Sequence, residues 1–220
     1  MQSVGDWVAE DFSRAAIFEL LGIDFCCGGK RSLKDACNEK GIDVENVLLI
    51  IAKGGQGATK IDYQSLSAEA LCDHIEKTHH AYLKEKLPFI QKLLQKIVEA
   101  HGDEYAPLLT KFDVFKEELT KHMEKEEQVV FPKIRLQADA TPACSLLEKE
   151  HMDAKEALEF FKEFTNGYEA PEGACMTHKI AFLELEALEK DMHLHVYKEN
   201  HLLFPINAAR KACLHGAPIS

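Results

Sequence analysis

Apolar residues recur at helical spacing along most of the chain, without the sustained alternation of apolar and polar positions that is typical of a strand. In the second part of the chain this pattern predicts four long helices with modest connections. They run from about Leu71 to Gly102, from Leu109 to Pro132, from Thr141 to Asn166 and from Pro171 to Pro205. We therefore expect an all-α fold whose larger part is an up-down-up-down four-helix bundle.

Local signals set the expected ends of these helices. Thr141 is a good N-cap residue, and Pro142 after it suits the first helical position. Gly102 and Gly167 are stop signals. Pro88 lies inside the first long helix and is expected to kink it.

The first part of the chain predicts a small helical domain. Three short helices are indicated by the apolar residues around Phe18, by a capping-box pattern that starts at Ser32, and by the apolar run around Leu48. A glycine-rich break follows at 54–59 and is typical of a linker. We predict a small helical domain at 1–57, a linker at 58–66 and the bundle at 67–220.

Composition and charge exclude several classes of function. The 220 residues carry a net charge of -11, which argues against binding to nucleic acid or to an anionic membrane surface. No secretory signal and no apolar run long enough to span a bilayer is visible. The seven cysteines are scattered apart from one adjacent pair, which favours a reducing cytoplasm over a disulfide framework.

Two stretches of the chain repeat one pattern, HMEKEEQVVFP from His122 and HVYKENHLLFP from His195. Residues four apart share a helix face, so His122 lies beside Glu126 and His195 beside Glu199. The repeat indicates that the second and fourth long helices are equivalent elements. A single such pair would be weak support for a metal site, but two pairs with matching Phe-Pro tails predict one.

Equivalent helices should each offer a ligand, which adds histidines from the first and third long helices. The third offers His151, and the first offers His79 or His80. Four histidines and two glutamates meeting in a bundle core suit two ions of iron, manganese or zinc, with each glutamate bridging the pair. A rival set of ferritin-like Glu-x-x-His motifs is also present and leaves His122 and His195 without a role. It comprises Glu76, His79, Glu126, Glu148, His151 and Glu199.

Together with DFCCGGK (24–30), THHAYLKEKLP (78–88) and EKEHMDA (148–154), these motifs resemble the iron–sulfur cluster repair di-iron proteins, the RIC family. That family joins a small ScdA-type N-terminal domain to a hemerythrin-like domain, and the resemblance covers nearly the whole chain. It implies two non-haem iron ions, oxo- and carboxylate-bridged. The implied ligands are His80, His122, Glu126, His151, His195 and Glu199.

The resemblance also implies a function, the repair of iron–sulfur clusters damaged by nitrosative and oxidative stress, with damaged iron–sulfur proteins or a cluster scaffold as partners. Alternatives are an enzyme that reduces nitric oxide at the irons and a carrier or sensor of dioxygen or nitric oxide. The oligomeric state is left open, with a homodimer as one option. His193 and His201 flank His195 and are the next candidates to touch the site, while Glu118 and Glu150 are candidates to orient ligands or line an iron exit path.

The adjacent Cys26 and Cys27 form a second chemical feature. A disulfide between sequence neighbours is strained, because a trans peptide holds their Cα atoms closer than a disulfide prefers. Lys30, Arg31 and a nearby helix start are expected to lower a thiol pKa here. We expect redox chemistry, nitric oxide capture or docking to a partner at this pair.

Overall fold

The computed structural model describes residues 2–54 and 62–214, with side chains for 2–52 and 62–209. Apart from one backbone bridge between Ser3 and Ser32, every regular element in these ranges is helical, which confirms the predicted all-α fold. The chain forms two compact units. Unit 1 comprises Met1–Leu71 and His193–Ser220, and unit 2 comprises Cys72–Met192.

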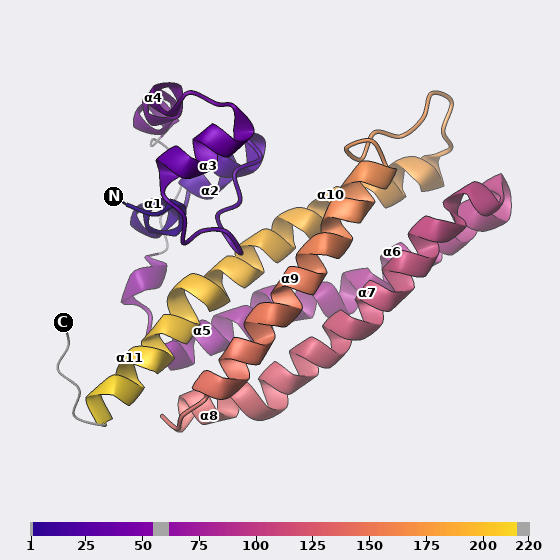
Figure 1. Ribbon diagram of the computed structural model, residues 1–220. Coiled ribbons are helices and arrows are strands. Elements are labelled where there is room, and N and C mark those ends of the chain that lie inside the picture. The colour runs from indigo at the N-terminus through magenta and orange to yellow at the C-terminus, as the bar shows by residue number, and fades with distance from the viewer. Residues whose placement is uncertain (1, 55–61, 215–220) are drawn as a thin grey trace. The chain divides into compact units, whose positions relative to one another are not determined.

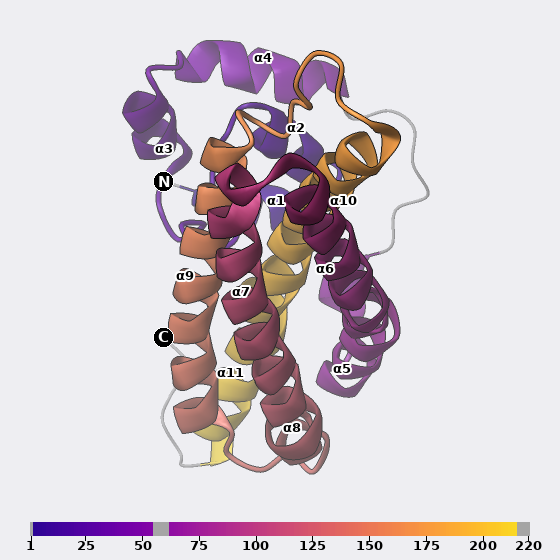
Figure 2. The ribbon, with the colours of Figure 1, turned by 90° about the vertical axis from the view of Figure 1, so that its right-hand side faces the viewer.

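Unit 2 is an up-down-up-down bundle of four helices (Figures 1 and 2). They are α6 (Ala81–His101), α7 (Ala106–Lys125), α9 (Thr141–Phe164) and α10 (Met176–Tyr197), whose last turn lies in unit 1. The shorter elements are the end of α5 (Ala68–Ile75), η2 (Glu76–His80), the 3-10 turn η3 (Asp103–Tyr105), η4 (Glu126–Val130) and α8 (Phe131–Arg135). Helix α7 packs between α6 and α9, as short antiparallel connections require.

The core of unit 2 follows directly from the apolar pattern. Leu83, Leu87, Ile90, Leu94 and Ile97 recur every three or four residues of α6 and are all buried. Pro88 lies inside α6, which nevertheless continues to His101. On the facing helices α7 and α9, three aromatic rings pack against one another in the core. They belong to Phe112, Phe115 and Phe161.

Three expected helix ends are wrong. Thr141 is the first residue of α9 rather than its cap, and its backbone amide donates to Asp139 Oδ1 at 3.0 Å. The chain from Pro171 makes a turn that includes Gly173 at φ +79°, so α10 begins only at Met176. Its far end does not stop at Pro205, because helical structure continues through η5 (Lys198–Leu203) into α11 (Phe204–Leu214).

Unit 1 contains the predicted small domain together with this C-terminal segment. Its helices are α1 (Val4–Glu10), α2 (Arg14–Leu20), α3 (Leu33–Lys40), α4 (Val44–Gly54), η1 (Tyr63–Ser65), the start of α5, the end of α10, η5 and α11. Helix α1 was missed, although Ser3 and Asp6 form a capping box at its start. The domain boundaries at 57 and 67 stay a prediction, because residues 55–61 lie outside those described.

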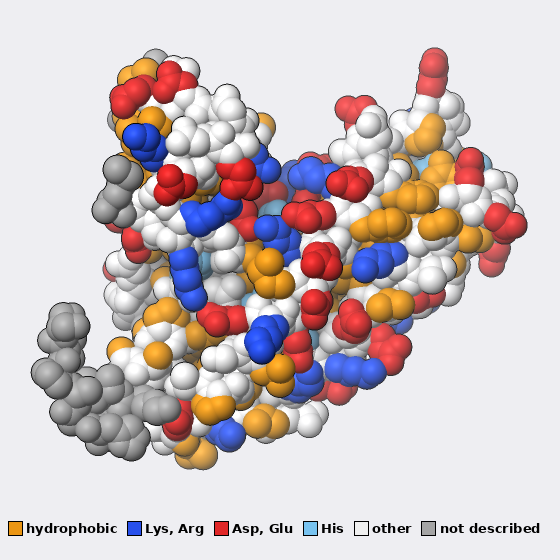
Figure 3. Space-filling view, in the orientation of Figure 1, with side chains coloured by type: hydrophobic (Ala, Val, Ile, Leu, Met, Phe, Trp, Pro, Cys, Tyr) orange, Lys and Arg blue, Asp and Glu red, His pale blue; other side chains and the backbone are white. Residues whose placement is uncertain are grey.

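Charged side chains of both signs are interspersed along the face of the bundle helices that Figure 3 shows. Some form ion pairs between helices, such as Lys86 with Glu184 at 2.8 Å and Lys162 with Glu189 at 3.1 Å. Glu189 is buried, and the cost of removing its charge from water offsets much of its attraction to Lys162. The buried apolar faces, rather than these pairs, hold the bundle together.

Candidate metal centre

Three π-helical turns interrupt the long helices, and each coincides with a predicted ligand motif. They are η2 (Glu76–His80), η4 (Glu126–Val130) and η5 (Lys198–Leu203). The amide of Phe131 bonds to the carbonyl of Glu126, and the amide of Phe204 to that of Glu199, each five residues back. Single π turns inside α-helices are frequent at functional sites. The interval from glutamate to phenylalanine in the repeat is therefore the length of one π turn.

The proline after each phenylalanine fits the same geometry. Pro132 and Pro205 have no amide hydrogen, so neither position needs an acceptor on the preceding turn. In a regular α-helix each proline ring would also clash with the backbone carbonyl four residues before it. A wider turn immediately before the proline relieves that clash. The Phe-Pro tail thus belongs to the backbone of the motif.

Four predicted ligands lie together in unit 2, all of them buried. Glu126 is 0% exposed, and its Oε2 lies 3.3 Å from His80 Nε2 while its Oε1 lies 3.4 Å from His122 Nε2. His151 Nε2 lies 3.1 Å from His122 Nε2. His122, Glu126 and His151 thus offer ligand atoms within 4.8 Å of one another.

The remaining two predicted ligands form a pair in unit 1. His195 Nε2 lies 2.9 Å from Glu199 Oε1, and both side chains are buried. The pair spans the end of α10 and the start of η5, as His122 and Glu126 span the end of α7 and the start of η4. Both copies of the repeated motif therefore have the same local structure.

Acidic residues outside the ligand set orient two of the histidines. His80 Nδ1 donates to Glu127 Oε1 at 2.8 Å, and Lys84 binds the same carboxylate at 2.6 Å. Burial opposes ionisation of Glu127, but the hydrogen bonds from Lys84 and His80 outweigh it and hold the pKa of Glu127 below its usual value. Sequence reasoning missed Glu127, since its partner lies on a different helix.

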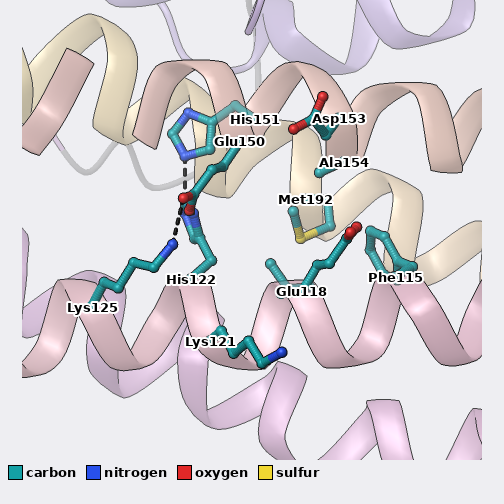
Figure 4. Close-up of a pocket in the computed structure, with 11 residues that line it drawn as sticks. Phe115, Glu118, Lys121, His122, Lys125, Glu150, His151, Asp153, Ala154 and Met192 are labelled. Atoms are coloured by element: carbon teal, nitrogen blue, oxygen red, sulfur yellow. Dashed lines mark hydrogen bonds and ion pairs between the residues drawn. The ribbon is translucent and has the colours of Figure 1, made fainter. Parts of the chain in front are cut away.

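Glu150 does the same for His122. His122 Nδ1 donates to Glu150 Oε2 at 2.9 Å, and Lys125 approaches Oε1 of that carboxylate at 2.5 Å. Burial again opposes ionisation, yet the bonds from Lys125 and His122 lower the pKa of Glu150. Figure 4 shows Glu150 reaching toward Lys125 beside the His122 and His151 rings. Such partners fix the orientation and tautomer of a ligand histidine.

The neighbouring histidine of the first helix faces another group. His79 is also buried, and its Nδ1 donates to Asp191 Oδ1 at 2.9 Å. The structure therefore sets His80, rather than His79, against Glu126. Glu76, a member of the ferritin-like alternative, uses both carboxylate oxygens to pair with Arg135, at 3.2 and 3.0 Å.

The chemistry of the unit 2 donors fits a bound cation. Because His80 and His122 donate through Nδ1, each neutral ring keeps a lone pair on Nε2, and both lone pairs face the Glu126 carboxylate. Acceptors that face each other at these distances repel unless a positive charge lies between them. A metal ion held by these atoms would supply that charge.

A cavity of about 220 Å³ opens beside the predicted ligands His122 and His151. Figure 4 shows Glu118, Asp153, Lys121 and Met192 among the residues around it. Phe115, Leu119, Lys125, Glu150 and Ala154 complete the lining. Two predicted ligand histidines thus line a space bordered by charged side chains.

The Cys26–Cys27 pair lies in a tight loop of unit 1. Asp24 Oδ1 accepts the backbone amides of both cysteines at 3.0 Å, and the two Sγ atoms are 3.8 Å apart. The hydrogen bond with Cys27, burial and the negative charge of Asp24 raise the pKa of Cys26 well above its ordinary value. The expected lowering of a thiol pKa is therefore wrong for Cys26, which is a buried thiol, while Cys27 is partly exposed.

His201 ties this loop to η5. It donates through Nε2 to the Cys26 carbonyl at 2.8 Å and stacks on Tyr197, whose hydroxyl donates to the carbonyl of Gly5 at 2.9 Å. A Cβ on Gly29 would lie 2.2 Å from the Phe25 carbonyl oxygen, so only glycine fits there. His201 therefore supports the loop.

His193, the other histidine considered near the site, has a different partner as well. Its Nδ1 donates to Glu19 Oε2 at 2.8 Å, and its ring meets Phe25 edge to face. Both contacts lie within unit 1 and join the end of α10 to the small domain. His193 is thus a packing residue of that domain.

Comparison with known proteins agrees with these features. Residues 1–53 match ScdA_N, a Domain of Unknown function (DUF542), and residues 73–206 match the Hemerythrin HHE cation binding domain. The chain is 34% identical over 209 residues to the iron-sulfur cluster repair protein YtfE of Escherichia coli O157:H7, covering 93% of this chain and 95% of that protein. It is 32% identical over 213 residues to the iron-sulfur cluster repair protein ScdA of Staphylococcus epidermidis, covering 91% and 95%.

Within the described ranges, no helix has both the length and the apolarity needed to cross a membrane. The similarity to these relatives extends along almost the full length of the chain. This chain belongs to the family of iron–sulfur cluster repair proteins that combine a ScdA N-terminal domain with a hemerythrin HHE cation-binding domain.

Proposed function

We propose that this protein binds two non-haem iron ions and supplies iron for the repair of iron–sulfur clusters damaged by nitrosative and oxidative stress. The observation that carries the proposal is the buried Glu126 carboxylate facing the Nε2 atoms of His80 and His122. The proposed ligands are His80, His122, Glu126, His151, His195 and Glu199. Mixed imidazole and carboxylate donors without thiolate suit iron.

The equivalence of the two repeated motifs supports adding the unit 1 pair to this set. His195 and Glu199 have the spacing, the burial and the π turn of His122 and Glu126. A carboxylate on each of two equivalent helices can bridge a pair of metal ions, and each ion then receives two histidines. In this arrangement Glu126 and Glu199 are the bridging ligands.

The surroundings of the ligands support a site that can both hold and release iron. Glu127 and Glu150 keep the Nε2 lone pairs of their histidines directed at the metal, which favours binding. The cavity beside His122 and His151 supports a route for iron between the site and solvent, with Glu118 and Glu150 along it. The iron is then cargo, and its bound form supplies Lewis-acid and redox chemistry.

The relatives' names indicate iron–sulfur proteins, or a scaffold that carries their clusters, as recipients. Cys27, which is partly exposed beside the buried Cys26, is the thiol better placed for docking. Nitric oxide and dioxygen are the small ligands that open coordination positions would accept.

Iron analysis combined with Mössbauer spectroscopy tests the proposed site. Anaerobically reconstituted protein should contain about two irons per chain. Glu126→Leu combined with Glu199→Leu should lose the spectroscopic coupling of the pair, while Glu124→Leu, at an exposed position of α7, should retain it. A double variant that keeps two coupled irons would refute the bridging role.

A transfer assay separates iron supply from the alternatives. The iron-loaded protein is incubated with an iron–sulfur enzyme whose cluster has been damaged by nitric oxide, and recovered enzyme activity is measured. Recovery accompanied by loss of iron from this protein supports supply. Nitrous oxide produced from nitric oxide would instead indicate a reductase, and reversible gas binding without loss of iron would indicate a carrier or sensor.

A further inference from the structure

A second group of reactive side chains lies where α6 ends and α10 begins, at the end of the bundle that carries the α9–α10 loop (Figure 1). We call it the Cys175 cluster, and it consists of His101, Tyr105, Cys175 and His178. All four residues belong to unit 2, and none is among the proposed iron ligands. The Cys175 thiol is exposed to solvent.

The thiol has donors on two sides. His101 Nε2 lies 3.8 Å from Cys175 Sγ, and the backbone amides of Thr177 and His178 at the start of α10 also point at the sulfur. The hydrogen bond with His101, followed by these amides, lowers the pKa of the Cys175 thiol. A histidine beside a helix N-terminus is the setting that favours a thiolate.

His178 adds an independent sign of a ligand. It is only 2% exposed, and its Nε2 has no hydrogen-bond partner among the described residues. The centroid of its ring lies 5.5 Å from that of His101 and 4.8 Å from that of Tyr105. The buried ring thus packs against His101, the histidine that contacts the thiol.

We propose that Cys175 is a site of thiol–disulfide exchange with small-molecule disulfides. The Cys175 proton passes to His101 Nε2, and the thiolate attacks one sulfur of the disulfide. A new sulfur–sulfur bond forms as the old one breaks, and the departing thiolate takes up the proton. The protein thiol is oxidised to a mixed disulfide, and the departing half of the reagent is reduced to a thiol.

The other described cysteines explain why the reaction selects Cys175. Burial, together with nearby negative charge, raises the pKa of Cys37, and Cys26 is likewise buried with a raised pKa. Cys72 and Cys144 are buried as well. Cys27 is partly exposed, so it provides the internal comparison.

The test measures mixed-disulfide formation on each cysteine by peptide mass spectrometry. The full-length reduced protein at neutral pH is treated with glutathione disulfide and, separately, with the uncharged bis(2-hydroxyethyl) disulfide. With both reagents Cys175 should react first, roughly three- to tenfold faster than Cys27. The advantage must appear with both, because the proposal assigns it to the surroundings of the thiol rather than to charge on the reagent.

Two variants separate the His101 contact from general effects. His101→Gln should lower the Cys175 rate roughly three- to tenfold and leave the Cys27 rate unchanged. Lys179→Gln removes a positive charge from the same end of α10 without touching the thiol contacts, and it should leave both rates unchanged. Thermal unfolding verifies that each variant is folded. Equal rates at Cys175 and Cys27, or an unchanged rate in His101→Gln, would overturn the proposal.

Discussion

Replacing Glu127 by glutamine should weaken metal binding without unfolding the protein. Glu127 accepts the Nδ1 proton of His80 at 2.8 Å and is held from outside by Lys84 at 2.6 Å. Its carboxylate therefore fixes the tautomer that leaves His80 Nε2 facing Glu126. Glutamine can still accept one hydrogen bond, but it lacks the charge that makes the imidazole a stronger ligand.

The size of the effect follows from where the side chain lies. Loss of a hydrogen-bonded partner behind a ligand histidine typically costs about 10–100-fold in metal affinity, which is about 1.4–2.8 kcal/mol. Glu127 is 26% exposed, so solvent screens part of its charge. We therefore expect the lower end, about tenfold. The Glu127–Lys84 pair contributes at most about 1 kcal/mol to folding, which explains why the variant should still fold.

The assay is competitive titration of the metal-free protein with Co²⁺ in the presence of a chelator, followed by absorbance. Glu124→Gln is the matched control, because it removes the same charge from an exposed position three residues before Glu127. The control should bind as the parent protein does. An affinity of Glu127→Gln within about twofold of the parent would contradict the orienting role, as would an equal loss in both variants.

Three further outcomes are expected. Gly29→Ala should lower the free energy of unfolding by about 1–3 kcal/mol, because the added Cβ would lie 2.2 Å from a backbone oxygen. Gly28→Ala should lower it less, because the nearest atom to its Cβ, at 2.8 Å, is the movable tip of an arginine. Chemical denaturation measures both free energies. The folded-state pKa values of Glu127 and Glu150 lie below the usual 4.5, so their stabilisation is present above pH 4.5 and is lost as pH falls through the folded values. The melting temperature of the metal-free protein should therefore fall less on acidification below pH 4.5 in the Glu127→Gln, Glu150→Gln double variant than in the parent. An equal pH dependence in the two proteins would count against these pKa shifts. Metal binding should release protons and weaken as the pH falls, as titration in weak buffer can show, and binding independent of pH would contradict the proposed imidazole and carboxylate ligands.

Much of the candidate centre was visible in the sequence because its spacing is local. A helix places residues four apart on one face, so the pairs His122–Glu126 and His195–Glu199 could be predicted without tertiary structure. The apolar stripe of α6 likewise required only helical periodicity. The choice between His79 and His80 could not be made this way, because a π turn alters the register on which face assignments rest.

Contacts between distant segments were beyond the reach of such patterns. His80 and Glu127 lie on different helices, and His201 meets the Cys26 carbonyl from the opposite end of the chain. The buried state of the Cys26 thiol also depends on how the loop packs, which reversed the expected direction of its pKa. The sequence by itself determined an all-helical chain with two predicted ligand pairs on helix faces. The period of the α-helix places residues four apart on the same face, whatever the rest of the fold does. Only the tertiary structure decided which carboxylate orients each histidine and which thiol is exposed, because burial and partner depend on segments that meet after folding.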